Sequence, residues 1–212
     1  MLVAGDQNWS ADGRWLAFSM SHNSGVNSIW IWGVGEAAPH QVTGALNTAY
    51  EPVFDPEGKY LFFFSDREYH PQISSLEWNF AGNRTTGIFA LALRKDVPSP
   101  FPPQSDEVKP DTTAAAATPA AAATPAPRGR RPAADTAKTA PKGPVQVNID
   151  FDGLAQRVTP VPVPADNYGG LEAVKGNLLY VKRPAFYYGR EAGTEASLVV
   201  FNFEDRKATT LA

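Results

Sequence analysis

Apolar and aromatic residues gather in short runs separated by polar turns, and one of these runs occurs twice in similar form. The stretch "WSADGRWLAFS", from Trp9 to Ser19, returns at an offset of 45 residues as "FDPEGKYLFFFS". Each copy predicts the aromatic end of one strand, a tight turn and a second strand, over residues 15–19 and 60–64. Because these second strands are aromatic or aliphatic at most positions, we expect them to be buried on both faces.

The turn between the two strands has a recognisable chemistry. Pro56 fixes φ at the second position of a turn. The acidic residues Asp12 and Glu57 can cap backbone N–H groups, and the glycines next to them, Gly13 and Gly58, accept positive φ. The two copies therefore predict the same hairpin corner.

A third and weaker copy lies in "GGLEAVKGNLLYVKR". Gly176 stands at the glycine position of the turn and residues 178–181 form the strand, but Lys175 replaces the acidic residue. Each copy is followed by another apolar run: "SIWIWGV", "GIFALAL" or "SLVVFNF". Behind the first and the last of these runs, a polar turn leads to a fourth strand, in "GEAAPHQVT" and "EDRKATTLA".

The repeat thus predicts four short antiparallel strands in about 45 residues, which is the size of a β-propeller blade. The expected fold class is all-β, a partial β-propeller of about three four-stranded antiparallel blades. The alternative is three unrelated hairpins in a sandwich, but register, turn chemistry and period together favour the propeller.

The number of blades is itself informative. Because a propeller closes with roughly four to eight blades, three blades leave two open edges with unpaired backbone groups. We therefore expect either a segment of a larger propeller or a ring completed by another chain. We also expect this chain alone to be poorly soluble or oligomeric.

An abrupt change of composition interrupts the middle blade. Residues 96–145 are rich in alanine and proline, with a single aromatic residue, Phe101. Prolines break the alanine runs, so we expect a disordered, partly polyproline-II loop. The resulting domain boundaries are 1–95 for blades one and two, 96–145 for the insertion, and 146–212 for the rest of blade two and blade three. The alternative is a recognition tail with a basic patch, formed by Arg128, Arg130, Arg131, Lys138 and Lys142.

Charge and composition exclude several classes of function. The formal net charge of −3 gives no electrostatic basis for binding nucleic acid or an anionic membrane. The absence of cysteine excludes disulfides and thiolate metal sites. No apolar run approaches the roughly 20 residues that a membrane helix needs. The first residues, "MLVAGDQNWS", lack the basic start and apolar stretch of a signal peptide.

Residues that carry chemistry are few and scattered. The histidines are His22, His40 and His70. None has metal-ligand spacing; we expect loop positions at 22 and 70, and His40 at the entry to a fourth strand. "SDREYHP" holds a charged cluster that could face a channel or a ligand, although a loop ion pair is the simpler interpretation; its members are Asp66, Arg67 and Glu68.

Motifs for catalysis or phosphate binding are missing from the sequence. There is no G-x-S-x-G elbow, and "NYGGLE", from Asn167, lacks the strand-to-helix context of a phosphate loop. We therefore predict no catalytic, cofactor-binding or metal-binding residue in this chain, and no cofactor. The residues alone support a propeller segment that acts as a scaffold or a binding module.

Several stretches resemble a known family. "WSADGRWLAFS" and "FDPEGKYLFFFSDR" are similar to the propeller repeats of tricorn-type proteases and TolB-like proteins. With "RKDVPSPF" and "RVTPVPVPADNYGGL", the chain resembles the second propeller of bacterial tricorn-like peptidases of the S41 serine peptidase family. The resemblance covers nearly all of the chain outside the insertion.

The resemblance implies a protein with two propellers, a PDZ-like module and a serine peptidase core. It implies peptides and these other domains as partners, possible homo-oligomers of the full-length protein, and propellers that gate peptides toward the core. The catalytic residues of the family lie downstream of the matched segment, so none maps onto this chain. Cytoplasmic location is expected, or periplasmic location if an export signal lies upstream. The alternatives are a free-standing TolB-like binding propeller and, more distantly, an exopeptidase with an added hydrolase domain.

Overall fold

The computed structural model describes residues 4–68, 71–73, 80–82, 84–102, 145–184 and 195–212. All of them belong to one compact unit, while a second unit, Pro103–Gly143, lies outside the described residues. Residues 103–144, which make up most of the predicted insertion and include its basic patch, lie outside the described residues, so the predicted disorder remains a prediction. His70 also lies outside them.

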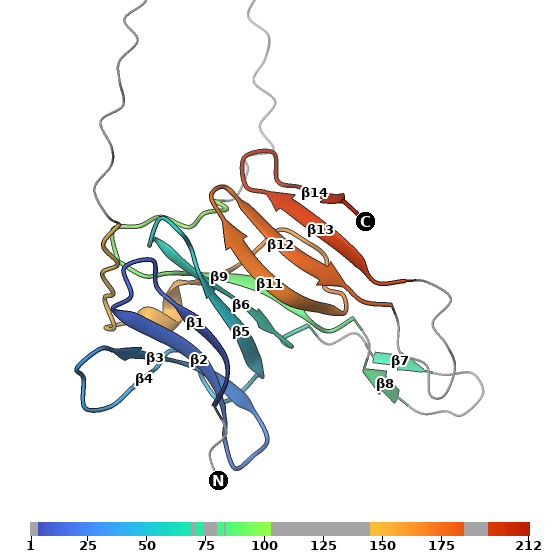
Figure 1. Cartoon of the computed structure of the whole chain (residues 1–212). Coiled ribbons are helices and arrows are strands. Elements are labelled where there is room, and N and C mark those ends of the chain that lie inside the picture. The colour runs from blue at the N-terminus through green and yellow to red at the C-terminus, as the bar shows by residue number, and fades with distance from the viewer. Residues whose placement is uncertain (1–3, 69–70, 74–79, 83, 103–144, 185–194) are drawn as a thin grey trace, which may run out of the picture. The chain divides into compact units, whose positions relative to one another are not determined.

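Three four-stranded antiparallel sheets make up the described unit (Figure 1). Blade 1 contains, in spatial order, β1 (Ala4–Trp9), β2 (Trp15–Ser21), β3 (Asn27–Gly33) and β4 (His40–Gln41). Blade 2 contains β5 (Ala49–Phe54), β6 (Tyr60–Ser65), β9 (Gly87–Ala92) and β10 (Val158–Pro160). Blade 3 contains β11 (Tyr168–Val174), β12 (Asn177–Lys182), β13 (Ser197–Asn202) and β14 (Lys207–Thr210). The predicted all-β fold class, with three four-stranded blades, is confirmed.

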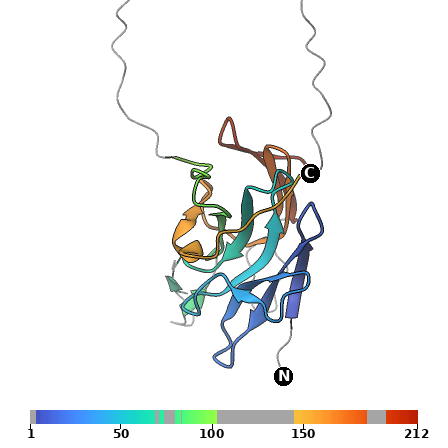
Figure 2. The same ribbon diagram turned by 90° about the vertical axis from the view of Figure 1, so that its left-hand side faces the viewer.

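Two smaller elements accompany the blades. A hairpin of β7 (Pro71–Ile73) and β8 (Phe80–Gly82) lies between β6 and β9 in the chain, and the sequence analysis did not anticipate it. The single helical turn of the described residues is the 3₁₀ turn η1 (Leu154–Arg157), which contacts β9. Figure 2 shows η1 on the side of the middle sheet away from β1.

The three turn glycines occupy equivalent corners, as the repeat predicted. Gly13, Gly58 and Gly176 each lie between the first and second strands of a blade, at φ of 68°, 70° and 75°. In blades 1 and 2 the glycine N–H donates to the carbonyl three residues earlier, that of Ser10 (2.9 Å) or Asp55 (2.8 Å). Blade 3 has a tighter hairpin, because its flanking strand residues are separated only by residues 175–176.

The capping of these turns differs partly from the prediction. In blade 1, Asp12 does accept a backbone N–H, that of Arg14, at 3.2 Å. In blade 2, the carboxylate that accepts the N–H of Lys59 (3.3 Å) is Asp55, whereas Glu57 binds the side-chain Nζ of Lys59 at 2.7 Å. Asp55, the residue just before Pro56, therefore supplies a cap in blade 2.

Two apolar cores hold the sheets together, one at each blade boundary. We call the face of a blade that is turned toward the preceding blade its front face, and the opposite face its back face. Between blades 1 and 2, the back-face residues Ala17, Ile29 and Ile31 pack in one cluster with the front-face residues Leu61 and Phe63. The second cluster joins the back face of blade 2 to the front face of blade 3; it includes Phe62, Phe64, Ile88, Leu178, Tyr180 and Phe201.

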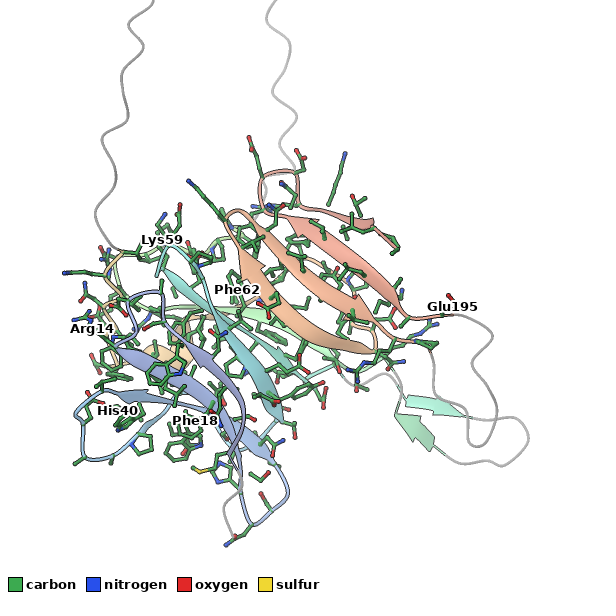
Figure 3. All side chains as sticks on the ribbon, viewed as in Figure 1. Arg14, Phe18, His40, Lys59, Phe62 and Glu195 are labelled. Atoms are coloured by element: carbon green, nitrogen blue, oxygen red, sulfur yellow. The ribbon has the colours of Figure 1, made fainter. Side chains whose placement is uncertain are left out.

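The prediction of strands buried on both faces holds for one repeat and is wrong for the other. Leu61, Phe62, Phe63 and Phe64 of β6 are all fully buried, because β6 lies between two neighbouring blades. In β2 burial alternates, with Ala17 and Ser19 buried and the intervening residues only half-buried. In the part of the chain that the structure describes, a neighbouring blade packs only on the back face of blade 1, so one face of β2 stays partly open (Figure 3, where Phe18 and Phe62 are labelled).

The structure describes residues 96–102, the first residues of the predicted insertion. This segment leaves β9 and reaches blade 3, where Phe101 is buried with its ring 5.7 Å from both Phe201 and Phe203. Arg206 donates to the carbonyl of Pro102 at 2.9 Å. We call residues 94–102 the outgoing arm; the single aromatic residue of the predicted loop is what anchors it.

The segment after the insertion docks on blade 1. The N–H of Val147 donates to Asp12 Oδ2 at 2.8 Å, and its carbonyl accepts from Arg14 (2.6 Å) and from the indole of Trp15 (3.0 Å). Burial works against ionisation of Asp12, but hydrogen bonds from Ser10, Val147 and Arg14 outweigh it and hold the pKa of this carboxyl well below its usual range. We call residues 145–157 the returning arm.

Candidate functional site

The first strand of each blade lies at one edge of its sheet, and these inner strands follow one another. β1 contacts β5, and β5 contacts β11. The inner strands of a β-propeller surround its central channel. We therefore treat β1, β5 and β11 as the candidate functional site of the chain (Figure 1).

Each inner strand carries a β-bulge at the same place. The register shifts fall between these pairs of residues: Gly5 and Asn8, Tyr50 and Val53, Gly169 and Glu172. Within the bulges, Asp6, Glu51 and Gly170 have φ of 50°, 48° and 66°. Non-glycine residues with positive φ are uncommon, so two acidic residues at equivalent bulges identify a built feature of the inner strands.

Glu51 joins the inner strands of blades 2 and 3. Its Oε2 atom accepts the N–H of Gly170 at 2.6 Å and that of Leu171 at 3.0 Å. A carboxylate that accepts two backbone N–H groups makes charge-assisted hydrogen bonds, which are stronger than neutral ones. The bulge of blade 3 is thus held by the bulge residue of blade 2.

Asp6 makes the corresponding contact one blade earlier. Its Oδ2 atom accepts the N–H of Glu51 at 3.4 Å and the hydroxyl of Ser19 at 3.0 Å. Nearby, Asn8 Oδ1 accepts the N–H of Phe54 at 2.9 Å. Because the aspartate side chain is one methylene shorter than that of glutamate, its contact to the next strand is longer, and Asn8 adds a second bond across the same boundary.

We call these contacts the bulge links. The sequence analysis missed them, although a signal was present: Asp6 and Glu51 obey the same offset of 45 as the repeat but lie upstream of the quoted motif. Their partners are backbone N–H groups of other blades, which no residue type reveals. Only the three-dimensional arrangement shows that each acid faces the next bulge.

A hydroxyl and carboxylate network adjoins the bulge of β5. The Tyr50 hydroxyl lies 3.0 Å from Thr86 Oγ1 and 3.3 Å from Asp66 Oδ1, and Thr86 donates to the same Asp66 oxygen at 2.8 Å. Burial, helped by the charge of Asp66, raises the pKa of Tyr50 to about 12. The Tyr50 hydroxyl is therefore neutral at physiological pH and acts as a hydrogen-bonding group rather than a base.

The charged cluster predicted from "SDREYHP" is divided between two surroundings. Asp66 joins the Tyr50 network, while the Arg67 guanidinium lies 4.8 Å from the Phe89 ring centroid and 5.8 Å from that of Phe63. Arg67 also donates to Ser65 Oγ at 3.1 Å. Asp66 and Arg67 thus support packing around the end of β6, and the loop ion pair remains a prediction.

A buried aspartate lies next to this network, between blades 2 and 3. Asp166 pairs with Lys182 Nζ at 2.6 Å and with Arg84 Nε at 3.6 Å, and its backbone bridges to Thr86. Its side chain is only 11% exposed, so the two cations offset the cost of burying the charge. This cluster fixes the entry into β11 and has the composition of a structural ion pair.

The predicted histidine positions are confirmed where the structure describes them. His22 follows β2 in a loop, with its Nε2 2.9 Å from Ser28 Oγ. His40 opens β4, pairs with Glu36 at 3.1 Å and stacks on Phe151 of the returning arm, with the rings 4.0 Å apart. Both histidines therefore serve local packing.

Across the described residues, no group of three or more His, Cys, Asp or Glu side chains could hold a metal ion. Within the same ranges, no helix is long and apolar enough to cross a membrane. What the inner strands do offer is backbone N–H and carbonyl groups at sheet edges, together with carboxylates fixed at bulges. Such an arrangement can bind an extended peptide by strand addition.

Both end blades keep an open apolar face. On the front face of blade 1, Leu16 pairs with Trp32 and Phe18 with Trp30; all four are only half-buried, and Trp9 beside them is 51% exposed. The open back face of blade 3 is aliphatic instead. Its members are Leu179, Val181, Leu198 and Val200.

These open faces correspond in register to faces that are packed elsewhere in the chain. Leu16 occupies the position of Leu61 in blade 2, and Phe18 that of Phe63. Within the described residues, the three blades thus leave one front face and one back face without a packed neighbouring blade.

Comparison with known proteins agrees with this arrangement. The family model for the tricorn protease second β-propeller domain matches residues 2–212. The chain belongs to this family. The tricorn protease homolog 1 of Streptomyces coelicolor is 28% identical over 176 residues, which cover 83% of this chain and 15% of that protein. The tricorn protease homolog of Saccharolobus solfataricus is 20% identical over 174 residues, covering 82% and 13%.

Solved structures show the same fold. A crystal structure of the tricorn protease superposes with a TM-score of 0.68 at 18% identity, covering 98% of this chain and 18% of that one. A TolB-like protein from Agrobacterium tumefaciens superposes with a TM-score of 0.55 at 10% identity, covering 99% and 49%. The tricorn-family chain described here therefore spans less than a quarter of the tricorn proteins it matches.

Proposed function

We propose that this chain is a non-catalytic part of the second propeller of a tricorn-like serine peptidase, and that it helps admit extended peptides toward a peptidase core outside this chain. The observation that carries the proposal is the row of three blades whose inner strands lie side by side, with one open front face and one open back face. Membership in the tricorn second-propeller family supports the same conclusion.

The physical basis of the gating role is size selection. A channel bordered by sheet edges admits an extended chain, which can pair with backbone groups, and excludes a folded domain. The inner strands here are tied to one another through the bulge links and two apolar cores. A rigid border keeps the width of a channel constant, as selection by size requires.

The test compares linear and constrained peptides on the full-length protein. The substrate is a fluorogenic peptide with two cysteines, used either oxidised to a disulfide loop or reduced. We expect the reduced, extensible form to be cleaved at least about tenfold faster. A serine peptidase without propellers supplies the background ratio for the same two substrates. If the ratio of the cleavage rates of the reduced and oxidised peptides is the same for both enzymes, the gating role is contradicted.

A free-standing binding propeller is the second candidate, because the TolB-like structure accommodates 99% of this chain. At 10% identity that likeness concerns the fold alone. The two candidates differ in the domains encoded after the propeller. A PDZ-like segment and a serine peptidase domain further along the reading frame support the first, and a reading frame that ends after the propeller supports the second.

A further inference from the structure

The two blade boundaries of this chain are built to one plan, although their apolar residues differ. At each boundary a back face packs on a front face. At each, the acidic bulge residue of the earlier blade accepts an N–H of the bulge in the later blade: Asp6 from Glu51, then Glu51 from Gly170 and Leu171. The direction is the same both times, so the links form a series along the inner strands.

We propose that the open front face of blade 1 binds a blade from outside this chain, and that the inner-strand bulge of that blade carries an acidic residue whose carboxylate accepts the bulge N–H groups of Asp6 and Gln7. These N–H groups correspond in register to those of Gly170 and Leu171, which bind Glu51. The proposal rests on the proposed function, in which the chain is one segment of a larger propeller.

The open face itself fits such a partner. It presents aromatic and aliphatic side chains in the register of the packed front faces of blades 2 and 3. The packed back faces of blades 1 and 2 differ from each other in their apolar residues, yet each adds an acidic bulge residue. The partner is therefore defined by an apolar back face together with one carboxylate at the inner edge.

A second copy of this chain does not meet that description. The open back face of the described chain belongs to blade 3, whose bulge residue is Gly170 and has no side chain. Glu172, at the position of Asn8, could at most replace the bond that Asn8 makes to Phe54. Two copies joined front to back would thus lack the bulge link.

This difference can be turned into an experiment on the chain itself. At position 170, a Cβ atom would meet only Val181, at 3.4 Å, which is an ordinary contact distance. Asp6 and Glu51 already hold a similar positive φ with a side chain present. Gly170→Glu should therefore give blade 3 the missing carboxylate, and Gly170→Gln is the matched control with the same backbone cost and no charge.

Sedimentation equilibrium of the three proteins measures their front-to-back association. We expect Gly170→Glu to associate about tenfold more tightly than both the wild type and Gly170→Gln, as an extra charge-assisted hydrogen bond of roughly 1.4 kcal/mol would give. Hydrogen exchange at the amides of Asp6 and Gln7 should slow only in the Gly170→Glu assembly. Equal association of all three proteins, with equal exchange, would overturn the proposal.

A second measurement keeps the proposal testable if Gly170→Glu does not fold. In Glu51→Gln, we expect the amides of Gly170 and Leu171 to exchange about tenfold faster than in the wild type. Glu172→Gln, which alters an exposed carboxylate on the same inner strand, should leave them unchanged. If Glu51→Gln also leaves them unchanged, the links hold no blade in place and the proposal fails.

The reading frame separates this proposal from the proposed function. A blade encoded upstream with Asp or Glu at its inner-strand bulge agrees with both. An upstream blade with an uncharged residue there contradicts the bulge link while the propeller segment stands. A reading frame without any further blade, combined with the absence of a second chain that supplies one, contradicts the proposed function itself.

Discussion

Blades 1 and 2 begin with the same repeat but have different surroundings. Phe63 and Phe18 occupy the same register position, yet Phe63 is fully buried and Phe18 only half-buried. Likewise, Phe54 is 5% exposed and its counterpart Trp9 is 51% exposed. The repeat therefore encodes a blade, while the energy gained from each apolar side chain depends on whether a neighbouring blade covers it.

The largest expected effect comes from truncating the two equivalent phenylalanines, Phe63 and Phe18. Phe63→Ala should lower the free energy of unfolding by about 3–5 kcal/mol, because it opens a cavity in a closed core. Phe18→Ala should lower it by about 1–2 kcal/mol, since the side chain is already partly in water. Urea denaturation of dilute protein measures both. Equal losses would mean that the front face of blade 1 is covered in solution.

The turn glycines give a second matched pair. A Cβ atom at Gly13 would meet nothing within 4 Å, whereas one at Gly58 would lie 2.8 Å from Val147 and 3.2 Å from Val145. Both residues have positive φ, which costs an alanine roughly 1–2 kcal/mol. Gly58→Ala should therefore destabilise the chain by about 1–3 kcal/mol more than Gly13→Ala, through displacement of the returning arm. Thermal unfolding of the two variants decides whether that arm is bound as described.

The same two turns should respond oppositely to pH. The depressed pKa of Asp12 means that its contribution to stability is present above the ordinary value of about 4 and is lost as the pH falls toward the folded-state value. Burial raises the pKa of Asp55, so the folded state binds the extra proton and stability falls as the pH rises through that window.

Asparagine variants isolate the two contributions. Asp12→Asn should cost about 2 kcal/mol at pH 7, by weakening hydrogen bonds to a charged group, and progressively less in acid. The free energy of unfolding of Asp55→Asn should increase relative to that of the wild type as the pH rises from about 4 to 7. Urea denaturation across this range gives both slopes. Parallel slopes would contradict the assignment of opposite shifts.

The smallest expected effect comes from the insertion. Deleting residues 105–143 should change the free energy of unfolding by less than about 1 kcal/mol, because loop length adds little entropy cost. The anchors of both arms, Phe101 and Val147, would remain in place. A deletion variant with a short glycine and serine linker can be compared by calorimetry. A loss of cooperative unfolding would show that the insertion belongs to the fold.

How much of this structure the sequence could predict depends on the range of the interactions. The blades follow from local signals, since the turn at Gly13 and Gly58 and the apolar runs lie within single repeats. The partial burial of β2 could not be predicted from its own residues, because it depends on how many neighbouring blades pack on blade 1. The position of Glu51 was visible, but its bond to Gly170 joins residues 119 apart in sequence.

The contacts of the two arms were equally beyond prediction from the sequence. Composition predicted a loop through residues 96–145, and it could not reveal that Phe101 reaches the rings of blade 3. Nor could it reveal that Val147 meets Asp12, 135 residues away. Single side chains bound across long separations set these contacts, and the alanine- and proline-rich composition around them gives no sign of their partners.

The path of the two arms has a consequence for the order of folding. Between β9 and its sheet partner β10, the chain passes through Phe101, which packs on blade 3, and Val147, which binds blade 1. The segment between β9 and β10, the outermost strand of the middle sheet, thus contacts both neighbouring blades. Long-range pairing of this kind is slow. During synthesis, blade 1 can assemble from consecutive residues as they emerge, whereas blade 2 must wait for a strand that is translated long after its first three.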